Sequence, residues 1–333
     1  MGEILAAPCA SSSSSPSSSS RGDGSSHATS ERDGRVAWLH SGSAGVEHIL
    51  AVPRVRDAVA PLTNARGAFS ASLGEWALFA SLWFAKKVHA MRASQAKGEW
   101  MRDTVGMLQG KTMSIVGYGD IGRACAVRAK AFGMKVVALR RDPSKARSTS
   151  NWSPYDRGGV VNASLARFPT HRDRPAADDT SSVRSDPIQA EGDFVVLALP
   201  HTPETEARSI HWSPYDRGGV GLIDASMIAS MKPTGVLVNV GRGAVVDEDA
   251  LVDALTREKI KGAALDVTAT EPLPAGHAFY ALENCLMSFH CADLTEDYHE
   301  LTMTTFIRHA RAYVGEEEGD DAAWNVVSKE KGY

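Results

Sequence analysis

This chain contains few cysteines, and they lack the spacing of a disulfide framework or a zinc site. Only four of the 333 residues are cysteines, and no two of them form a Cys-x-x-Cys pair. A disulfide framework or a cysteine-based zinc site needs more cysteines at closer spacing. We therefore expect no metal site, and an intracellular, reducing compartment is the simplest interpretation.

Long apolar runs and a surplus of positive charge are also missing. The longest apolar run, Trp76 to Ala85, is ten residues and includes Ser81, whereas a helix needs about 20 to cross a bilayer. The formal net charge is -4 and the pI is about 6.3. General nucleic-acid binders usually carry a basic surplus. We expect neither a membrane protein nor a nucleic-acid-binding one.

The first 35 residues lack the apolar content of a folded core. Residues 11–20 are nine serines and one proline. Such a segment cannot bury enough apolar surface to offset the entropy lost on ordering. We expect a disordered tail over residues 1–35 and a cytoplasmic protein. The alternative is an organelle transit peptide, because transit peptides are also rich in serine.

What the chain does contain is a regular alternation of apolar strands and helical patterns. Strands are predicted at Val36–His40, Met113–Val116, Lys135–Leu139, Phe194–Leu199, Val236–Val240 and Ala263–Val267. Apolar residues recur at helical spacing from Leu73 to Val88, and a further helix is predicted over Asp247–Glu258. Strands that are apolar throughout and alternate with helices indicate an α/β fold with a doubly wound parallel sheet.

A nine-residue sequence, Trp-Ser-Pro-Tyr-Asp-Arg-Gly-Gly-Val, occurs identically at residues 152–160 and 212–220. Two copies are too few for a repeat architecture, which needs at least three stacked units. The surrounding residues lack helical or strand periodicity. We interpret both copies as surface insertions, near 146–192 and 207–220. The alternatives are a translated repetitive or intronic element and a functional peptide-binding motif.

A glycine-rich turn follows the predicted strand Met113–Val116 and opens a predicted helix that ends near Phe132. Its residues are Gly117, Tyr118, Gly119, Asp120, Ile121 and Gly122. In this context the pattern is typical of a dinucleotide site. The first glycine allows a tight turn, the second lets the pyrophosphate approach the backbone, and the third lets the helix pack on the sheet. The phosphates would lie at the positive end of the helix.

Two arginines, Arg140 and Arg141, stand where the second predicted strand ends. An NAD site usually has an acidic residue there, which bonds the ribose hydroxyls. Two guanidinium groups suit a 2′-phosphate instead. The sequence therefore favours NADP. NAD is the alternative, with both arginines in solvent or with Asp142 acting as the acid.

Several blocks then resemble, in order, the motifs of the D-isomer-specific 2-hydroxyacid dehydrogenase family, which includes glyoxylate and hydroxypyruvate reductases. The blocks are Ser43–His48, Gly110–Thr112, Leu199–Thr205, Val238–Gly243, Ala264–Val267, Glu271–Leu273 and Ser288–Asp293. The resemblance covers most of residues 36–145 and 193–310. It implies a Rossmann-type cofactor domain and a flavodoxin-like substrate domain.

The resemblance also implies a role for each site residue. His290 would donate a proton to the substrate carbonyl, and Glu271 would orient His290 and favour its protonated form. Arg242 would bind the substrate carboxylate and polarise the carbonyl. Backbone N–H groups of Ala44 and Gly45 would complete the carboxylate site. These roles are chemically sensible, because reduction of a 2-oxo acid needs a hydride, a proton and a charge partner.

Cofactor contacts are implied outside the glycine-rich turn as well. They would come from Leu199, Pro200, Thr205, Val240, Gly241, Arg242, Asp266 and His290. By the same resemblance, Asp266 would lie near the nicotinamide.

Few residues precede the Ser43–His48 block, so the substrate domain is predicted to be truncated. We expect that domain to comprise residues 36–74 and 291–333, and the cofactor domain to comprise residues 75–290. The predicted function is NAD(P)H-dependent reduction of a small 2-oxo acid by a homodimer, with the 73–90 helix as a contact. Two alternatives are a dinucleotide-sensing, corepressor-like protein and an inactive truncated homologue.

Overall fold

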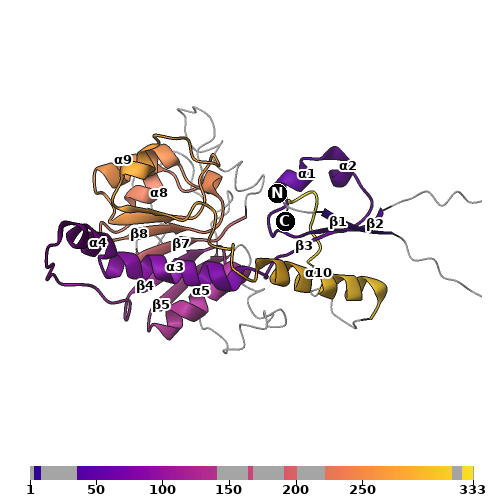
Figure 1. Cartoon of the computed structure of the whole chain (residues 1–333), viewed down its shortest axis with the longest axis horizontal. Coiled ribbons are helices and arrows are strands. Elements are labelled where there is room, and N and C mark those ends of the chain that lie inside the picture. The colour runs from indigo at the N-terminus through magenta and orange to yellow at the C-terminus, as the bar shows by residue number, and fades with distance from the viewer. Residues whose placement is uncertain are drawn as a thin grey trace, which may run out of the picture.

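A seven-stranded sheet forms the larger of the two units of the protein (Figure 1). The computed structural model describes residues 4–8, 36–140, 164–167, 191–200, 222–316 and 325–332. The strands of this sheet are β4 (Thr112–Val116), β5 (Lys135–Arg140), β6 (Ser164–Arg167), β7 (Phe194–Leu197), β8 (Val236–Asn239), β9 (Gly262–Leu265) and β10 (Cys285–Met287). Every neighbouring pair is parallel, and the spatial order is β10-β9-β8-β7-β4-β5-β6. The α/β prediction is confirmed.

The order of the strands reverses beside β4. From β4 the chain runs outward to β5 and β6, and then returns to place β7 on the other side of β4. In doubly wound sheets, ligands bind beyond the carboxyl ends of the strands at such a reversal. The topology therefore places a binding site where β4 and β7 end.

Helices cover both faces of this sheet. They are α3 (Ser70–Ala85), α4 (Val88–Lys97), α5 (Asp120–Ala131), α8 (Ala225–Ala229) and α9 (Glu248–Thr256). Alternate strand residues enter different cores: Ile115 packs with α3 and α5, and Val116 packs with α8 and α9. The strands consist of continuous apolar residues because both faces of the sheet are buried.

The crossing of α3 and α5 is unusually close. A Cβ atom added to Gly74 of α3 would lie 2.9 Å from the backbone carbonyl carbon of Ala124 in α5. The helix predicted from Leu73 is present as α3, but it ends at Ala85, because Lys87 has a left-handed φ of 53° and a separate helix, α4, begins at Val88. The buried residues of α3 pack in the core on one face of the large sheet. The predicted domain boundary at residues 74–75 lies inside this helix.

The smaller unit is built around a three-stranded sheet in the order β1-β2-β3 (Figure 1). Its elements are β1 (Ile4–Pro8), β2 (Val36–Ser41), β3 (Leu62–Asn64), α1 (Glu47–Leu50), α2 (Pro53–Arg56) and α10 (Tyr298–Val314). The indole of Trp38 in β2 stacks on the rings of Phe306 and Tyr313 in α10. The C-terminal part of the chain therefore packs against the N-terminal strands.

Two predictions about irregular segments were wrong. Residues 4–8 form β1, antiparallel to β2, within the predicted disordered tail. Residues 164–167 form β6, parallel to β5, within the segment predicted to lack strands. In both cases an open strand edge supplies the hydrogen-bond partners, which a local pattern does not reveal.

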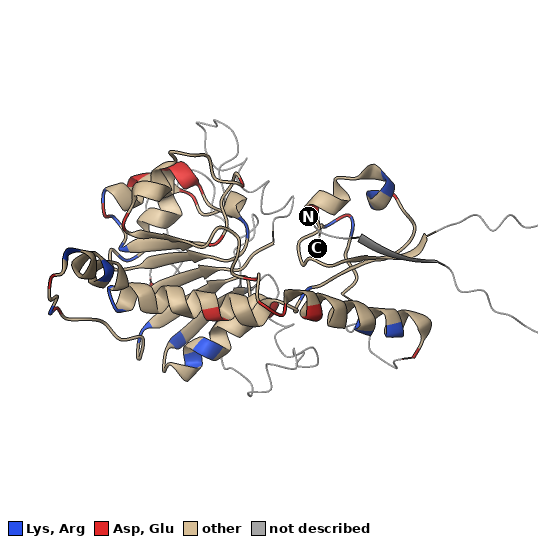
Figure 2. Ribbon diagram, viewed as in Figure 1, with Lys and Arg blue, Asp and Glu red and all other residues tan. Residues whose placement is uncertain are grey.

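Some expectations fall outside the described residues. These are both nine-residue copies, most of the two predicted insertions, Arg141 and Thr205. None of the helices in the described ranges combines the length and the hydropathy that crossing a bilayer requires. Figure 2 shows Lys and Arg interspersed with Asp and Glu on both units.

Candidate active site

The turn between β4 and α5 accepts only glycine at two positions. Gly117 has a φ of 99°, and an added Cβ would lie 2.6 Å from the carbonyl oxygen of Ala198. An added Cβ on Gly122 would lie 2.2 Å from the carbonyl oxygen of Gly117. Left-handed backbone and contacts this short exclude a side chain. The roles predicted for the first and third glycines agree with this geometry.

The middle glycine borders open space. An added Cβ on Gly119 would meet no atom within 4 Å, although Gly119 directly precedes α5. No side chain caps the first turn of this twelve-residue helix. Its first N–H groups therefore lack a side-chain partner at the cap and suit an anion such as a pyrophosphate. These residues fit a dinucleotide.

The neighbouring predicted cofactor residues gather at the same edge of the sheet. An added Cβ on Gly241 would lie 2.6 Å from the carbonyl oxygen of Leu199, and Val240 N–H donates to the carbonyl oxygen of Leu197 at 3.1 Å. Pro200 follows directly, and Arg140 is the last residue of β5. Tyr118 and Ile121 instead pack partly against the core beneath α3 and α5.

Arg242 is presented by a rigid turn at the end of β8. The side chain of Asn239 accepts from Gly241 N–H and donates to the carbonyl oxygen of Arg242, both at 3.0 Å. An added Cβ on Gly243 would lie 1.9 Å from the backbone of Thr268, so the turn is held closely against the loop after β9. These contacts hold in place the turn that carries Arg242.

The guanidinium of Arg242 reaches the smaller unit. Its Nε donates to Glu47 Oε1 at 3.0 Å, its Nη2 lies 3.5 Å from Glu47 Oε2, and its Nη1 donates to the carbonyl oxygen of Gly241 at 2.9 Å. An added Cβ on Gly45 would lie 1.8 Å from Nη2. The structure thus brings the Ala44–Gly45 loop and Arg242 together, as predicted. Glu47 was not predicted as a site residue.

His290 and Glu271 form a direct pair. His290 Nδ1 lies 2.7 Å from Glu271 Oε2, and Glu271 Oε1 accepts from Thr268 N–H at 3.0 Å. A carboxylate only accepts, so Nδ1 carries the hydrogen and Nε2 is left to face a ligand. Both side chains are partly exposed, at 44% and 36%. The arrangement suits an acid–base imidazole held by a carboxylate.

The loop that carries His290 is held by the buried carboxylate of Asp266. Asp266 Oδ1 accepts from Ser288 Oγ at 2.6 Å and from the backbone N–H groups of Cys291 and Ala292 at 3.1 Å. Phe289 and His290 both have a φ of 55°, which is rare for residues with side chains. Asp266 therefore stabilises an unfavourable backbone that aims the imidazole.

Asp293 is a site residue to which the sequence assigned no role. Burial raises the pKa of its carboxyl and the negative charge of Asp266 adds to this, whereas the charges of His290 and Arg242 oppose it. Asp293 thus lies within electrostatic reach of both proposed catalytic cations. Its place three residues after His290 is the only sequence signal that marks it.

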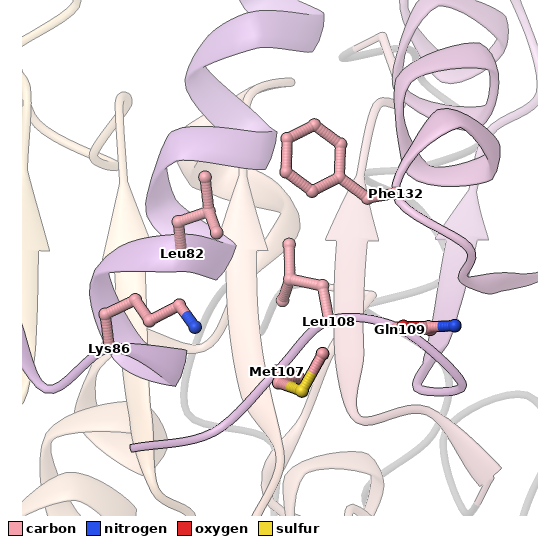
Figure 3. A pocket seen from close by; sticks show the side chains of 6 residues that line it. All are labelled: Leu82, Lys86, Met107, Leu108, Gln109 and Phe132. Carbon is pink, nitrogen blue, oxygen red and sulfur yellow. The ribbon is translucent and has the colours of Figure 1, made fainter.

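A pocket of about 260 Å³ lies away from these residues. Figure 3 shows its lining side chains, which are Leu82, Lys86, Met107, Leu108, Gln109 and Phe132. They come from the end of α3, the segment before β4 and the end of α5, and none of them is a site residue. Across the ranges that the structure describes, no cluster of three His, Cys, Asp or Glu could hold a metal ion.

Comparison with known proteins gives one family. The model of the D-isomer specific 2-hydroxyacid dehydrogenase, NAD binding domain, matches residues 78–164 and 157–292. The glyoxylate reductase of Thermococcus litoralis is 29% identical over 248 residues, which are 72% of this chain and 62% of that protein. The chain therefore spans less than two thirds of this relative.

Two solved structures share the fold. A D-isomer specific 2-hydroxyacid dehydrogenase family protein from Aeromonas salmonicida superposes with a TM-score of 0.67 at 26% identity, covering 88% of this chain and 79% of that one. The NADPH-dependent glyoxylate/hydroxypyruvate reductase of Sinorhizobium meliloti, solved with NADP and sulfate, gives a TM-score of 0.66 at 24% identity. It covers 90% of this chain and 80% of that one.

Proposed function

This chain belongs to the D-isomer specific 2-hydroxyacid dehydrogenase family, and we propose that it reduces a small 2-oxo acid to a 2-hydroxy acid with NAD(P)H. The observation that carries the proposal is the His290–Glu271 pair, at 2.7 Å, on a loop whose backbone Asp266 holds. Asp266 N–H also donates to the carbonyl oxygen of Asn239, whose side chain holds the Arg242 turn, so both groups belong to one site. The substrate class is that of glyoxylate and hydroxypyruvate, which relatives of this fold are named for.

Each residue contributes one step. Arg242 binds the substrate carboxylate beside the Ala44–Gly45 loop and draws electron density from the carbonyl. The bound dinucleotide supplies the hydride to the carbonyl carbon. His290 Nε2 donates the proton to the carbonyl oxygen, while Glu271 holds Nδ1 and stabilises the imidazolium. Asp266 keeps the His290 loop in position.

NADP is the proposed cofactor, with NAD as the weaker alternative. Arg140 ends β5, which is the strand whose end carries the ribose-binding acid in NAD sites. A guanidinium there binds a 2′-phosphate, whereas an acidic residue repels it. The NADPH dependence named for the Sinorhizobium meliloti relative supports the same choice.

The test is oxidation of NADPH, followed by absorbance, with glyoxylate, hydroxypyruvate and pyruvate as candidate substrates. We expect saturable turnover with at least one of the first two. NADPH binding is measured separately by fluorescence. A protein that binds NADPH and reduces none of these acids would contradict the enzyme proposal and favour a dinucleotide sensor.

We further propose that the protein is a homodimer that uses the surface near the end of α3. Several large apolar side chains are exposed there: Phe79 on α3, Trp100 and Met107 in the following segment, and Phe132 after α5. Of these four side chains, Met107 and Phe132 line the pocket in Figure 3. Light scattering of the purified protein and of Trp100→Glu tests the proposal, because the charge should produce a monomer.

A further inference from the structure

The ion pair between Glu47 and Arg242 has no role in the proposed reduction as it stands. Glu47 is the first residue of α1 in the smaller unit, and Arg242 follows β8 in the larger one. Their side chains are 33% and 31% exposed. The pair therefore joins the two units at the residue that would bind the substrate.

Glu47 presents to Arg242 the same chemical group that a substrate would. Its two carboxylate oxygens face Nε and Nη2, at 3.0 Å and 3.5 Å, which is the side-on geometry of a bound carboxylate. An added Cβ on Gly45 would lie 2.8 Å from Glu47 Oε2 and 1.8 Å from Nη2. The carboxylate of Glu47 thus lies where Arg242 and the Ala44–Gly45 loop meet.

The loop and the helix around Glu47 are firmly held. Asn64 Nδ2 donates to the carbonyl oxygen of Ala44 at 2.7 Å, and Ser43 Oγ donates to that of Gly45 at 2.9 Å. Val46 and Ile49, on either side of Glu47, are buried in the core of the smaller unit. With the backbone on both sides anchored, a move of the Glu47 carboxylate away from Arg242 has to come from rotation of its side chain.

Two carboxylates compete for one guanidinium in this arrangement. With Glu47 in place, the charge of Arg242 is already neutralised, so a substrate carboxylate meets no net attraction and a like charge beside it. Nη1 is also engaged, with the carbonyl oxygen of Gly241. Substrate binding on the Nε–Nη2 edge therefore requires that Glu47 swing out.

We propose that Glu47 is a built-in competitor for the substrate carboxylate, which lowers the affinity of the site for 2-oxo acids without taking part in hydride or proton transfer. The inference rests on the proposed function for its choice of substrate. The competition itself concerns any small carboxylate that Arg242 binds.

The test compares Glu47→Gln with the unmodified protein. The amide keeps the shape of the side chain and removes its charge. We expect KM for glyoxylate to fall about twofold to fivefold, the range for loss of a partly exposed competing ion pair, with kcat unchanged. The matched control is Glu75→Gln, which removes a surface ion pair with Arg128 at 3.3 Å, remote from the site. It should change neither constant.

A binding measurement separates this inference from the proposed function. Oxalate is a planar carboxylate that cannot be reduced, and calorimetry measures its affinity with and without NADPH. We expect Glu47→Gln to bind oxalate about twofold to fivefold more tightly, whether or not the protein turns over glyoxylate. Absence of turnover would thus reject the proposed function. The oxalate affinity would still test whether Glu47 competes with a bound carboxylate.

Unchanged or weaker oxalate binding by Glu47→Gln would overturn the inference. Glu47→Ala is the second variant and should give the same gain, because it also removes the charge. Melting temperatures are measured for both variants. If both fail to fold, the Glu47–Arg242 pair is needed for the stability of the contact between the two units, and the competitor role is wrong.

Discussion

At the scale of single residues, the site depends on side chains whose partners come from distant parts of the sequence. Glu271 pairs with His290, which lies 19 residues later in the chain, and Asp266 holds the loop that carries His290. Arg242 pairs with a residue 195 positions earlier. Each functional group is therefore positioned by a second polar group rather than by its own backbone alone.

The first residue-scale prediction concerns His290. His290→Ala should lower kcat about 10²–10⁴-fold, the usual contribution of a positioned proton donor. NADPH binding should persist, because the glycine-rich turn belongs to β4 and α5. Steady-state kinetics with glyoxylate and fluorescence titration of NADPH measure the two effects. The control is His299→Ala, an exposed histidine at the start of α10. Full turnover by His290→Ala would show that another group donates the proton.

The second residue-scale prediction concerns Arg140. Arg140→Asp should weaken NADPH binding by about 1–3 kcal/mol, because it replaces a charge-assisted contact with repulsion. NADH binding should change much less. Lys135→Asp makes the same charge change at the opposite end of β5 and is exposed, so it controls for general electrostatics. Equal affinities of the unmodified protein for NADPH and NADH would refute the NADP assignment.

At the scale of elements, two short strands, β1 and β6, form because each pairs with an open edge of a sheet. β1 covers the edge of β2, with Leu5 opposite His40. β6 extends β5 at the rim of the large sheet. Exposed edges invite pairing with other chains, so a covering strand protects the protein against association.

Removal of β1 provides the element-scale prediction. A chain that lacks residues 1–35 should melt several degrees lower than the full chain and should self-associate, because β2 then presents an open edge. Scanning fluorimetry and light scattering measure both. Deletion of residues 11–20 alone should have little effect, since it shortens the serine-rich connection and keeps β1. Identical melting of the full and truncated chains would show that β1 contributes no stability.

At the scale of the whole molecule, the smaller unit is built from both ends of the chain. His40 of β2 lies fully buried among Trp38, Thr63, Phe306 and His309. Burial, assisted by the positive charge of Arg308, lowers the pKa of His40 from 6.5 to about 4. The imidazole is therefore neutral in the folded protein at pH 5 to 6, where the unfolded chain would protonate it.

This pKa predicts how the free energy of unfolding depends on pH. Between pH 6.5 and 4 the unfolded state binds the extra proton, so stability falls as the pH falls through this range. The loss attributable to His40 amounts to at most about 3 kcal/mol at 1.36 kcal/mol per pH unit. Above pH 6.5 this residue contributes no pH dependence.

Urea unfolding at several pH values between 7.5 and 4.5 measures the effect. His40→Gln should flatten the dependence, although it also lowers the stability at pH 7.5 because it disturbs the contact with Thr63. His48→Gln removes an exposed histidine close in sequence and should leave the slope unchanged. The same slope in His40→Gln and the unmodified protein would assign the dependence to other groups, such as His309.

Arg242, Glu271 and His290 were predicted from the resemblance of their motifs to those of a known family. The sequence by itself determined the α/β class, the central strands and the glycine-rich turn. These features depend on local chemistry: continuous apolar runs for strands buried on both faces, and glycines where Gly117 and Gly122 leave no room for a Cβ. Only the tertiary structure decided the pairing of Glu47 with Arg242, the use of Asp266 to hold the His290 loop, and the strands β1 and β6. Each of these needs a partner from another part of the chain, and a local pattern carries no information about which distant groups the fold brings within hydrogen-bonding distance.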